Sequence, residues 1–219
     1  MKTQHVLITA ACAALSLGSI ARADDAVALA LELPTELAVG TPKDLSATPN
    51  LDPNKKPEPV KVPKDSKVLS KGKTVTSSDT EEPFEGELGY ITDGSKDGNE
   101  GYSVILSDKP QWVQIDLGAS ATIDAVVLWH YFKNDRVVFD VIVQVSDDPE
   151  FKTGVTTIFN NDTDNTCGQG AGTDKVYIGT YLGKQIAGKG AKGQYVRCWS
   201  NGSTDNKMNE YIEVEVWGR

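Results

Sequence analysis

The chain has 219 residues and a formal net charge of −9, because 31 acidic residues outnumber 22 basic ones. An acidic protein is poorly suited to nucleic acid or anionic lipid, so we expect neither as a partner. The same charge suits divalent cations and neutral ligands.

The first 23 residues have the features of a signal peptide. Lys2 provides a positive charge, residues 6–20 form an apolar stretch without charge, and Ala-Arg-Ala at 21–23 is a small-x-small cleavage sequence. The apolar stretch has about 15 residues, fewer than the roughly 20 of a transmembrane helix. We therefore expect cleavage before Asp24 and a mature chain that is secreted, periplasmic or associated with the cell surface. Its net charge would be −11, from 20 basic and 31 acidic residues.

Residues 24–66 have the composition of a linker. Seven of the ten prolines lie there, interleaved with Lys, Asp and Glu. Proline lacks a backbone donor and holds the chain extended, which predicts a semi-rigid Pro-rich tether. The apolar beginning of this segment, Val27–Leu33, leaves open that it docks on the following domain as a short segment.

From residue 67 to residue 219, apolar and polar residues alternate in short segments separated by Gly, Asn and Asp. Alternation with a period of two indicates strands, and no segment shows a helical period with caps. About eight short strands predict a single all-β domain, an antiparallel sandwich or barrel with one core. The strand segments are Trp112–Leu117, Thr122–Phe132, Val137–Ser146, Thr156–Phe159, Lys175–Thr180, Gln194–Ser200 and Glu210–Trp217.

Four of these segments carry motifs. Trp-Val-Gln-Ile-Asp-Leu-Gly at 112–118 and Val-Gln-Val-Ser-Asp-Asp at 143–148 precede Gln-Tyr-Val-Arg at 194–197 and Glu-Val-Glu-Val-Trp-Gly at 213–218. In this order they resemble the discoidin, or coagulation-factor type C, family of galactose-binding-like domains. The resemblance implies an eight-stranded jelly roll with neighbouring termini, and a carbohydrate, lipid headgroup or protein ligand held by loops at one end. The nearest bacterial members of that family are sugar-binding modules of exported glycoside hydrolases.

A glycine-bent loop at 92–98 is a candidate calcium site. Its carboxylates, Asp93 and Asp97, are four residues apart, and such a loop can direct carboxylate and carbonyl oxygens at a hard cation. The residues alone also fit a solvated turn. The family resemblance favours calcium and implies that Asp93 binds it together with Glu213 of the last strand, with Ser95 and Asp97 as contributors. The ion would brace the loops without taking part in catalysis.

Two loops supply candidate ligand contacts. The resemblance implies a basic residue near the segment 131–136, where Arg136, Asn134 and Asp135 offer donors and acceptors for sugar hydroxyls. Tyr102 in the preceding long loop offers an aromatic face. In the family geometry both loops open at the same end. Arg136 has an alternative role in an ion pair with a neighbouring aspartate, and the four tryptophans lie in strand patterns that place them in the core.

Two cysteines, Cys167 and Cys198, remain after removal of the signal peptide. In an oxidising compartment we expect them to pair. Closing a loop of about 32 residues would stabilise the fold by roughly 3–4 kcal/mol in the chain-entropy model. The alternative is two buried thiols.

Catalytic residues are scarce in the mature chain. His130 is its only histidine and lies in a buried strand pattern, which disfavours a Ser–His–Asp or Cys–His arrangement and a zinc site. Asp162-Thr163-Asp164 resembles the start of a calcium loop, but no glutamate follows at the twelfth position, so 160–174 is interpreted as a polar surface loop. A pair of carboxylates remains compatible with glycoside hydrolysis.

The sequence thus predicts an exported, non-catalytic module that binds carbohydrate with the support of calcium. A structural or protein-interaction module of an extracellular or periplasmic assembly is the first alternative, and a small exported hydrolase is the second.

Overall fold

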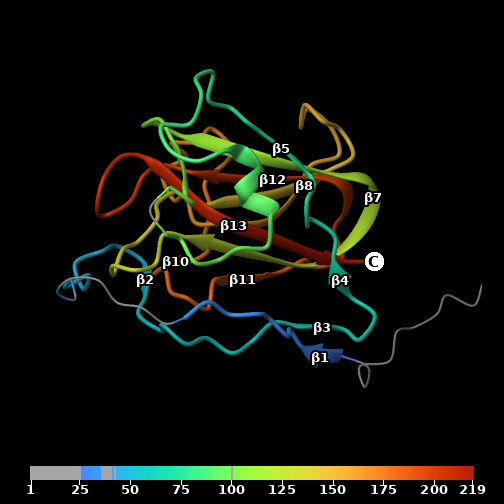
Figure 1. Ribbon diagram of the computed structural model, residues 1–219, viewed down its shortest axis with the longest axis horizontal. Helices are drawn as coiled ribbons and strands as arrows, with labels where there is room; N and C mark the ends of the chain where they lie inside the picture. Colours follow the sequence, from blue (N-terminus) through green and yellow to red (C-terminus); the bar gives the residue numbers. More distant parts are fainter. Residues whose placement is uncertain (1–25, 36–40, 42, 100) are drawn as a thin grey trace, which may run out of the picture.

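The computed structural model describes residues 26–35, 41, 43–99 and 101–219, so the predicted signal peptide lies outside the described residues. Within them, no helix has the length and apolar character to cross a membrane. The described part of the chain contains strands and one short 3-10 helix, η2 (Leu88–Thr92), and it confirms the all-β sandwich with almost no helix (Figure 1).

One long strand, β7 (Gln111–His130), organises both layers of the sandwich. Its first half pairs with one layer and its second half with the other, and all of these pairings are antiparallel. Gly118, near the middle of β7, has φ +83°, a backbone conformation that favours glycine. The sequence predicted two strands here; the structure joins them into one.

The two layers are assembled around β7 as follows. The first layer contains β5 (Thr74–Ser77), β12 (Lys192–Ser200), β8 (Ile142–Ser146) and β9 (Thr156–Asn160). The second contains β11 (Lys184–Ala187), β13 (Asn209–Gly218), β4 (Lys67–Val68) and β6 (Val104–Leu106).

The main core lies between these layers and follows from the alternating pattern of the strands. Val113 and Ile115 of β7, Val143 and Val145 of β8, and Val214 of β13 are all fully buried in one cluster. The predicted strand at 137–146 starts only at Ile142, because Asp140 adopts φ +52° and interrupts it.

The proline-rich segment is extended, as predicted, but it lies on the sandwich. β1 (Ala26–Ala28) pairs with β3 (Lys61–Pro63) along the lower edge of Figure 1, and β2 (Leu51–Asp52) pairs in parallel with β10 (Val176–Tyr177). Leu29 is buried and Leu31 packs against the cluster that contains it, whereas Val27 and Leu33 are exposed, so the segment docks through its middle. A second apolar cluster forms there from Leu29, Val62, Ala125, Val127, Trp129, Phe132 and Ile212. The segment therefore covers the outer face of the second layer.

Candidate functional site

The two loops that were expected to share one end of the sandwich do meet. The Lys133 ammonium donates a hydrogen bond to Asn99 Oδ1 at 2.9 Å, and the Tyr102 N–H donates to the Asn99 carbonyl at 2.9 Å. The loop after β7 and the loop before β6 are thereby tied together. This region is called the loop end below. The sequence placed Asn99 in the candidate loop that holds Tyr102 but gave neither it nor Lys133 a role, because the contact joins two segments that are distant in sequence.

Arg136, which was predicted as a ligand contact, is held inside the loop end. It is 5% exposed, and its guanidinium donates to Glu210 (2.7 Å), Asp205 (3.0 Å) and Asn134 (2.7 Å). It also lies over the Tyr131 ring, 4.4 Å from the centroid. Burial raises the pKa of Glu210, and the charge of Arg136 opposes that rise. The donors of Arg136 are thus engaged inside the protein.

The two neighbours of Arg136 are engaged as well. Asn134 accepts the Arg136 Nε hydrogen bond and reaches Asp205 at 3.5 Å, so it positions the arginine. Asp135 accepts a hydrogen bond from Lys55 of the N-terminal segment at 2.8 Å. The expected pairing of Arg136 with a neighbouring aspartate is replaced by pairs with acids about 70 residues away, which local sequence does not indicate.

Tyr102 is the predicted contact that the structure leaves available. Its side chain is 58% exposed, and its ring stacks on Tyr90 of η2 with centroids 5.9 Å apart and an interplanar angle of 29°. A tyrosine supported on one face and open to solvent offers a flat apolar surface with a polar tip. Phe84, which the sequence did not single out, is also strongly exposed, and it lies on the segment that pairs with residue 105.

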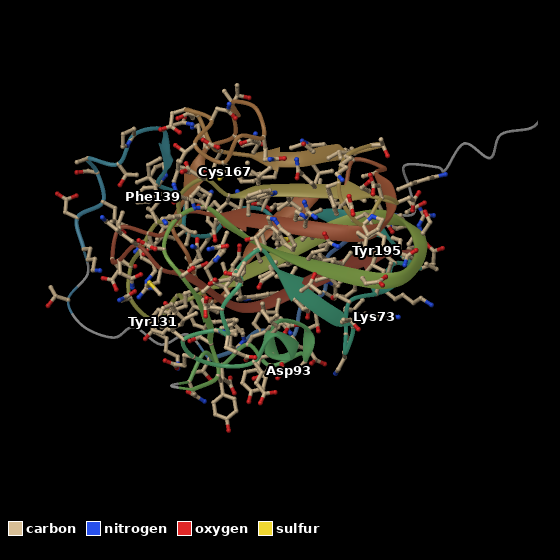
Figure 2. All side chains as sticks on the ribbon, turned by 90° about the horizontal axis from the view of Figure 1, so that it is seen from above. Lys73, Asp93, Tyr131, Phe139, Cys167 and Tyr195 are labelled. Atoms are coloured by element: carbon tan, nitrogen blue, oxygen red, sulfur yellow. The ribbon has the colours of Figure 1, made fainter. Side chains whose placement is uncertain are left out.

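The predicted calcium loop reaches the last strand. The Gly94 N–H donates to Glu213 Oε2 at 3.2 Å, and Figure 2 shows Asp93 next to η2. Glu213 is 1% exposed, and burial raises its pKa to about 8, with the negative charges of Asp93 and Glu215 adding to the rise. A cation beside Glu213 would stabilise its ionised form. The exposed side chains of Ser95 and Asp97 make no hydrogen bond with Glu213 within the described residues.

Lys96, in the middle of the calcium loop, was not anticipated. Its ammonium lies 2.7 Å from Glu215 Oε1, 3.4 Å from the Gly94 carbonyl and 5.1 Å from the centre of the Trp129 ring. Lys96, Gly94 and Glu215 line a cavity of about 220 Å³ together with Glu213. Lys96 therefore pairs with Glu215, and its charge also acts on Glu213, where it opposes the rise in pKa that burial causes.

A separate acidic cluster forms where the sequence indicated only a polar loop. Carboxylate oxygens of Asp140, Asp162 and Asp164 lie within 4.8 Å of one another, and no other group of this kind occurs among the described residues. The charges of Asp162 and Asp164 add to the effect of burial in raising the pKa of Asp140. Backbone N–H groups of Thr166 and Cys167 donate to Asp162, which accounts for the shape of the loop.

The predicted disulfide is absent, because Cys167 and Cys198 are both free and buried. Cys198 belongs to the main core from the middle of β12, whereas the Cys167 thiol lies 3.7 Å from the Asp140 carbonyl in the acidic loop. Burial raises the pKa of Cys198 to about 12, so its thiol stays protonated. The structure corresponds to the alternative of two buried thiols.

His130 packs inside the protein. Its Nδ1 lies 3.0 Å from the Glu210 carbonyl, and its ring centre lies 4.7 Å from that of Tyr211. Burial lowers the pKa of His130 to about 4, which keeps the ring neutral at physiological pH. This geometry fits a packing role at the end of β7.

The tryptophans are only partly in the core, which corrects the expectation for all four. Trp129 is buried, but Trp112 and Trp199 are half-buried cross-strand partners with ring centres 6.5 Å apart. Arg197 covers the Trp112 ring at 4.1 Å. An alternating strand has two faces, and the sequence alone did not show which face of these strands points outward.

With the geometry established, comparison with known proteins assigns the domain. Residues 90–198 match the family of NedA-like, galactose-binding domains of F5/F8 type C. The match confirms the resemblance that the motifs indicated, and this part of the chain is similar to F5/F8 type C (galactose-binding-like) domains. No match was found among curated protein sequences.

Solved structures show the same fold. A family 89 glycoside hydrolase from Clostridium perfringens is 17% identical over 69% of this chain and 14% of its own, with a TM-score of 0.51. The chain thus spans about a seventh of that enzyme. A chitosan-binding module of a chitosanase/glucanase from Paenibacillus sp. IK-5 is 23% identical over 69% of this chain and 99% of its own, with a TM-score of 0.45.

Proposed function

We propose that the chain is an exported, non-catalytic module that binds carbohydrate at the loop end. The observation that carries this proposal is Tyr102, an exposed ring stacked on a second tyrosine in a domain similar to those of the galactose-binding-like family. Aromatic rings bind the apolar face of a pyranose, and adjacent polar groups bind its hydroxyls. The name of the Paenibacillus module, which binds chitosan, is in keeping with a polysaccharide ligand.

Within the loop end, each residue takes a different part in this proposal. Tyr102 supplies the aromatic face, and Asn99, whose carbonyl accepts the Tyr102 N–H, supplies a neighbouring polar group. Lys133 is 8% exposed and holds the Asn99 side chain through its hydrogen bond. Arg136 and Asn134 act as positioning residues, because their hydrogen bonds hold the neighbouring loop in place. A shallow, wet site of this kind predicts weak affinity, on the order of 0.1–1 mM.

Calcium is a second part of the proposal. The donors fit a hard cation in part: Glu213 is a buried carboxylate with a raised pKa, and the Asp93 loop is already in contact with it. Asp93 and Glu213 would hold the ion, with Ser95 and Asp97 at the rim of the loop. Bound there, the ion would neutralise Glu213 and brace the loop against the last strand.

Glycan-array binding tests the carbohydrate proposal. Tyr102→Ala is expected to lose most retention of any glycan that the wild type binds. Tyr195→Ala is the matched control, because Tyr195 is a partly exposed tyrosine at the opposite end of the molecule (Figure 2). Equal loss in both variants, or none in either, contradicts a site at Tyr102. Release of sugar from a retained glycan would instead support the hydrolase alternative.

Thermal melting tests the calcium proposal. Binding to the folded state alone raises the melting temperature, so added calcium is expected to stabilise the wild type and a chelator to reverse the effect. Glu213→Gln is expected to abolish the shift, whereas Glu81→Gln, an exposed acid elsewhere, keeps it. A shift that survives Glu213→Gln places the ion elsewhere. N-terminal sequencing of the mature protein checks the cleavage before Asp24.

A further inference from the structure

Residues 43–56, called the strap below, lie across the loop end. Lys43 pairs with Asp205, and Lys55 pairs with Asp135 at 2.8 Å. Between these two points, β2 pairs with β10, and the Val176 N–H donates to the Asn50 carbonyl at 3.2 Å. Figure 2 shows the blue-to-teal ribbon of this segment at the end marked by Tyr131 and Phe139. The strap therefore contacts both sides of the loop end.

The acids that bind the strap belong to the group that shapes the loop end. Asp205 also accepts hydrogen bonds from Arg136 and Asn134, and Asp135 lies between those two residues in sequence. Lys133, which holds Asn99 through a hydrogen bond, is only two residues before Asp135. The strap is thus paired with the same loop that Lys133 ties to Asn99 of the Tyr102 loop.

The contacts that hold the strap are weak. In the pair of Lys55 with Asp135 the side chains are 47% and 23% exposed, and the pair of Lys43 with Asp205 is similarly open to solvent. Exposed ion pairs contribute little to stability and are screened by salt. The pairing of β2 with β10 covers only two residues of each strand. A cavity of about 510 Å³ also separates the strap from Phe139 and Thr204.

We propose that the strap is a displaceable cover of the loop end. Closed, it confines a ligand to the side of Tyr102. Open, it adds the rim around Asp135 and Asp205 to the binding surface. This inference rests on the proposed function, since it concerns access to the same loop end, but the position of the strap is measurable without any glycan.

Charge reversal of the two lysines tests the cover. Lys43→Glu/Lys55→Glu is expected to open the strap, while Lys56→Glu/Lys61→Glu changes the net charge equally at residues that form no ion pair within the described part of the chain. The probe is a water-soluble carbodiimide with glycine ethyl ester, which labels accessible carboxylates. Mass spectrometry of peptides is expected to show Asp135 and Asp205 labelled about fivefold faster in the first variant and unchanged in the control.

Hydrogen exchange provides a second measurement. The Val176 amide is expected to exchange about fivefold faster in the first variant, and also in the wild type when salt is raised from 0.05 to 0.5 M. Unchanged labelling and unchanged exchange overturn the cover, whatever the glycan array shows. Faster labelling with the same retention of a bound glycan also overturns it. Faster labelling with no glycan retained by any form supports the cover and contradicts the carbohydrate proposal instead.

Discussion

The N-terminal segment binds the sandwich in two different ways. Its two ends, residues 26–31 and 60–63, form an anchor: they pair as β1 and β3 and bury Leu29 and Val62 against the second layer. Its middle, the strap, has exposed ion pairs and one short strand pair. Burial of a whole aliphatic side chain contributes about 1.5–3 kcal/mol, whereas an exposed ion pair contributes about 0–1 kcal/mol. A few alternating apolar residues therefore decide which part of a proline-rich segment is fixed.

Deleting the anchor is expected to have the largest effect. A chain that starts at Lys64 lacks the strap as well as the anchor, leaves the apolar face around Val127 and Trp129 uncovered, and should lose about 4 kcal/mol of unfolding free energy. Replacing residues 43–56 by a Gly/Ser sequence of equal length should cost less than about 1 kcal/mol. Urea denaturation of both forms measures the difference. Similar losses would show that the strap and the anchor contribute alike.

Low pH is expected to destabilise the sandwich while the ion pair between the strap and Asp205 persists. The folded-state pKa of His130, about 4, is below its ordinary value of 6.5, so the unfolded chain binds the proton more readily. The contribution of His130 to stability is therefore full above pH 6.5 and falls between pH 6.5 and 4, by about 3 kcal/mol at the lower limit.

His130→Gln isolates this contribution. The variant should lack it, as the difference between the two pH profiles of denaturation will show. The hydrogen bond from Lys43 lowers the pKa of Asp205 below 3.8, so the Asp205 ion pair should persist through this range. The strap is thus expected to stay closed while the sandwich loses stability. Hydrogen exchange at the Val176 amide that accelerates between pH 6.5 and 4, before global unfolding, would contradict this.

A matched pair of leucines sharpens the comparison further. Leu29→Ala in the anchor removes a buried side chain and should cost about 2–3 kcal/mol. Leu45→Ala in the strap removes a partly exposed side chain and should cost less than about 1 kcal/mol. Thermal or urea unfolding gives both values. A larger loss for Leu45 would mean that the strap is held by apolar burial after all.

The smallest effect is expected for Lys55→Ala. Global stability should change by less than about 0.5 kcal/mol, because the pair with Asp135 is exposed. Tryptic cleavage between Lys43 and Asp44 should nevertheless accelerate relative to the wild type, since the strap opens more often. Lys61→Ala, in the anchor, serves as the comparison and should leave that cleavage unchanged.

The sandwich could be predicted from the sequence because the alternation of apolar and polar residues is visible within each strand. Alternation along residues 112–117 and 143–146, for example, places every second residue in the core, and the structure agrees. The contact of the Asp93 loop with Glu213 was available only from the family resemblance, since 119 positions separate Gly94 from Glu213. Which face of a strand points outward, and which strand it pairs with, depend on residues distant in sequence and cannot be read from the strand itself.

The sites were predicted less well for the same reason. Arg136 looked like a ligand contact because its partners, Asp205 and Glu210, belong to a distant part of the sequence. The sequence gave no role to Lys96 in the calcium loop, because its partner Glu215 is distant in sequence. Tyr102 stayed available, but its support from Tyr90 could not be foreseen.

Strand β7 has a consequence for how the molecule unfolds. Because a single strand belongs to both layers, neither layer can lose its pairing with β7 without disturbing the other. The domain is thus one cooperative unit, in which amides of β12 and β13 exchange with solvent only through global opening. The strap, by contrast, lies outside this unit and opens as a local fluctuation. Hydrogen exchange should therefore divide the molecule into one slow body and one fast segment.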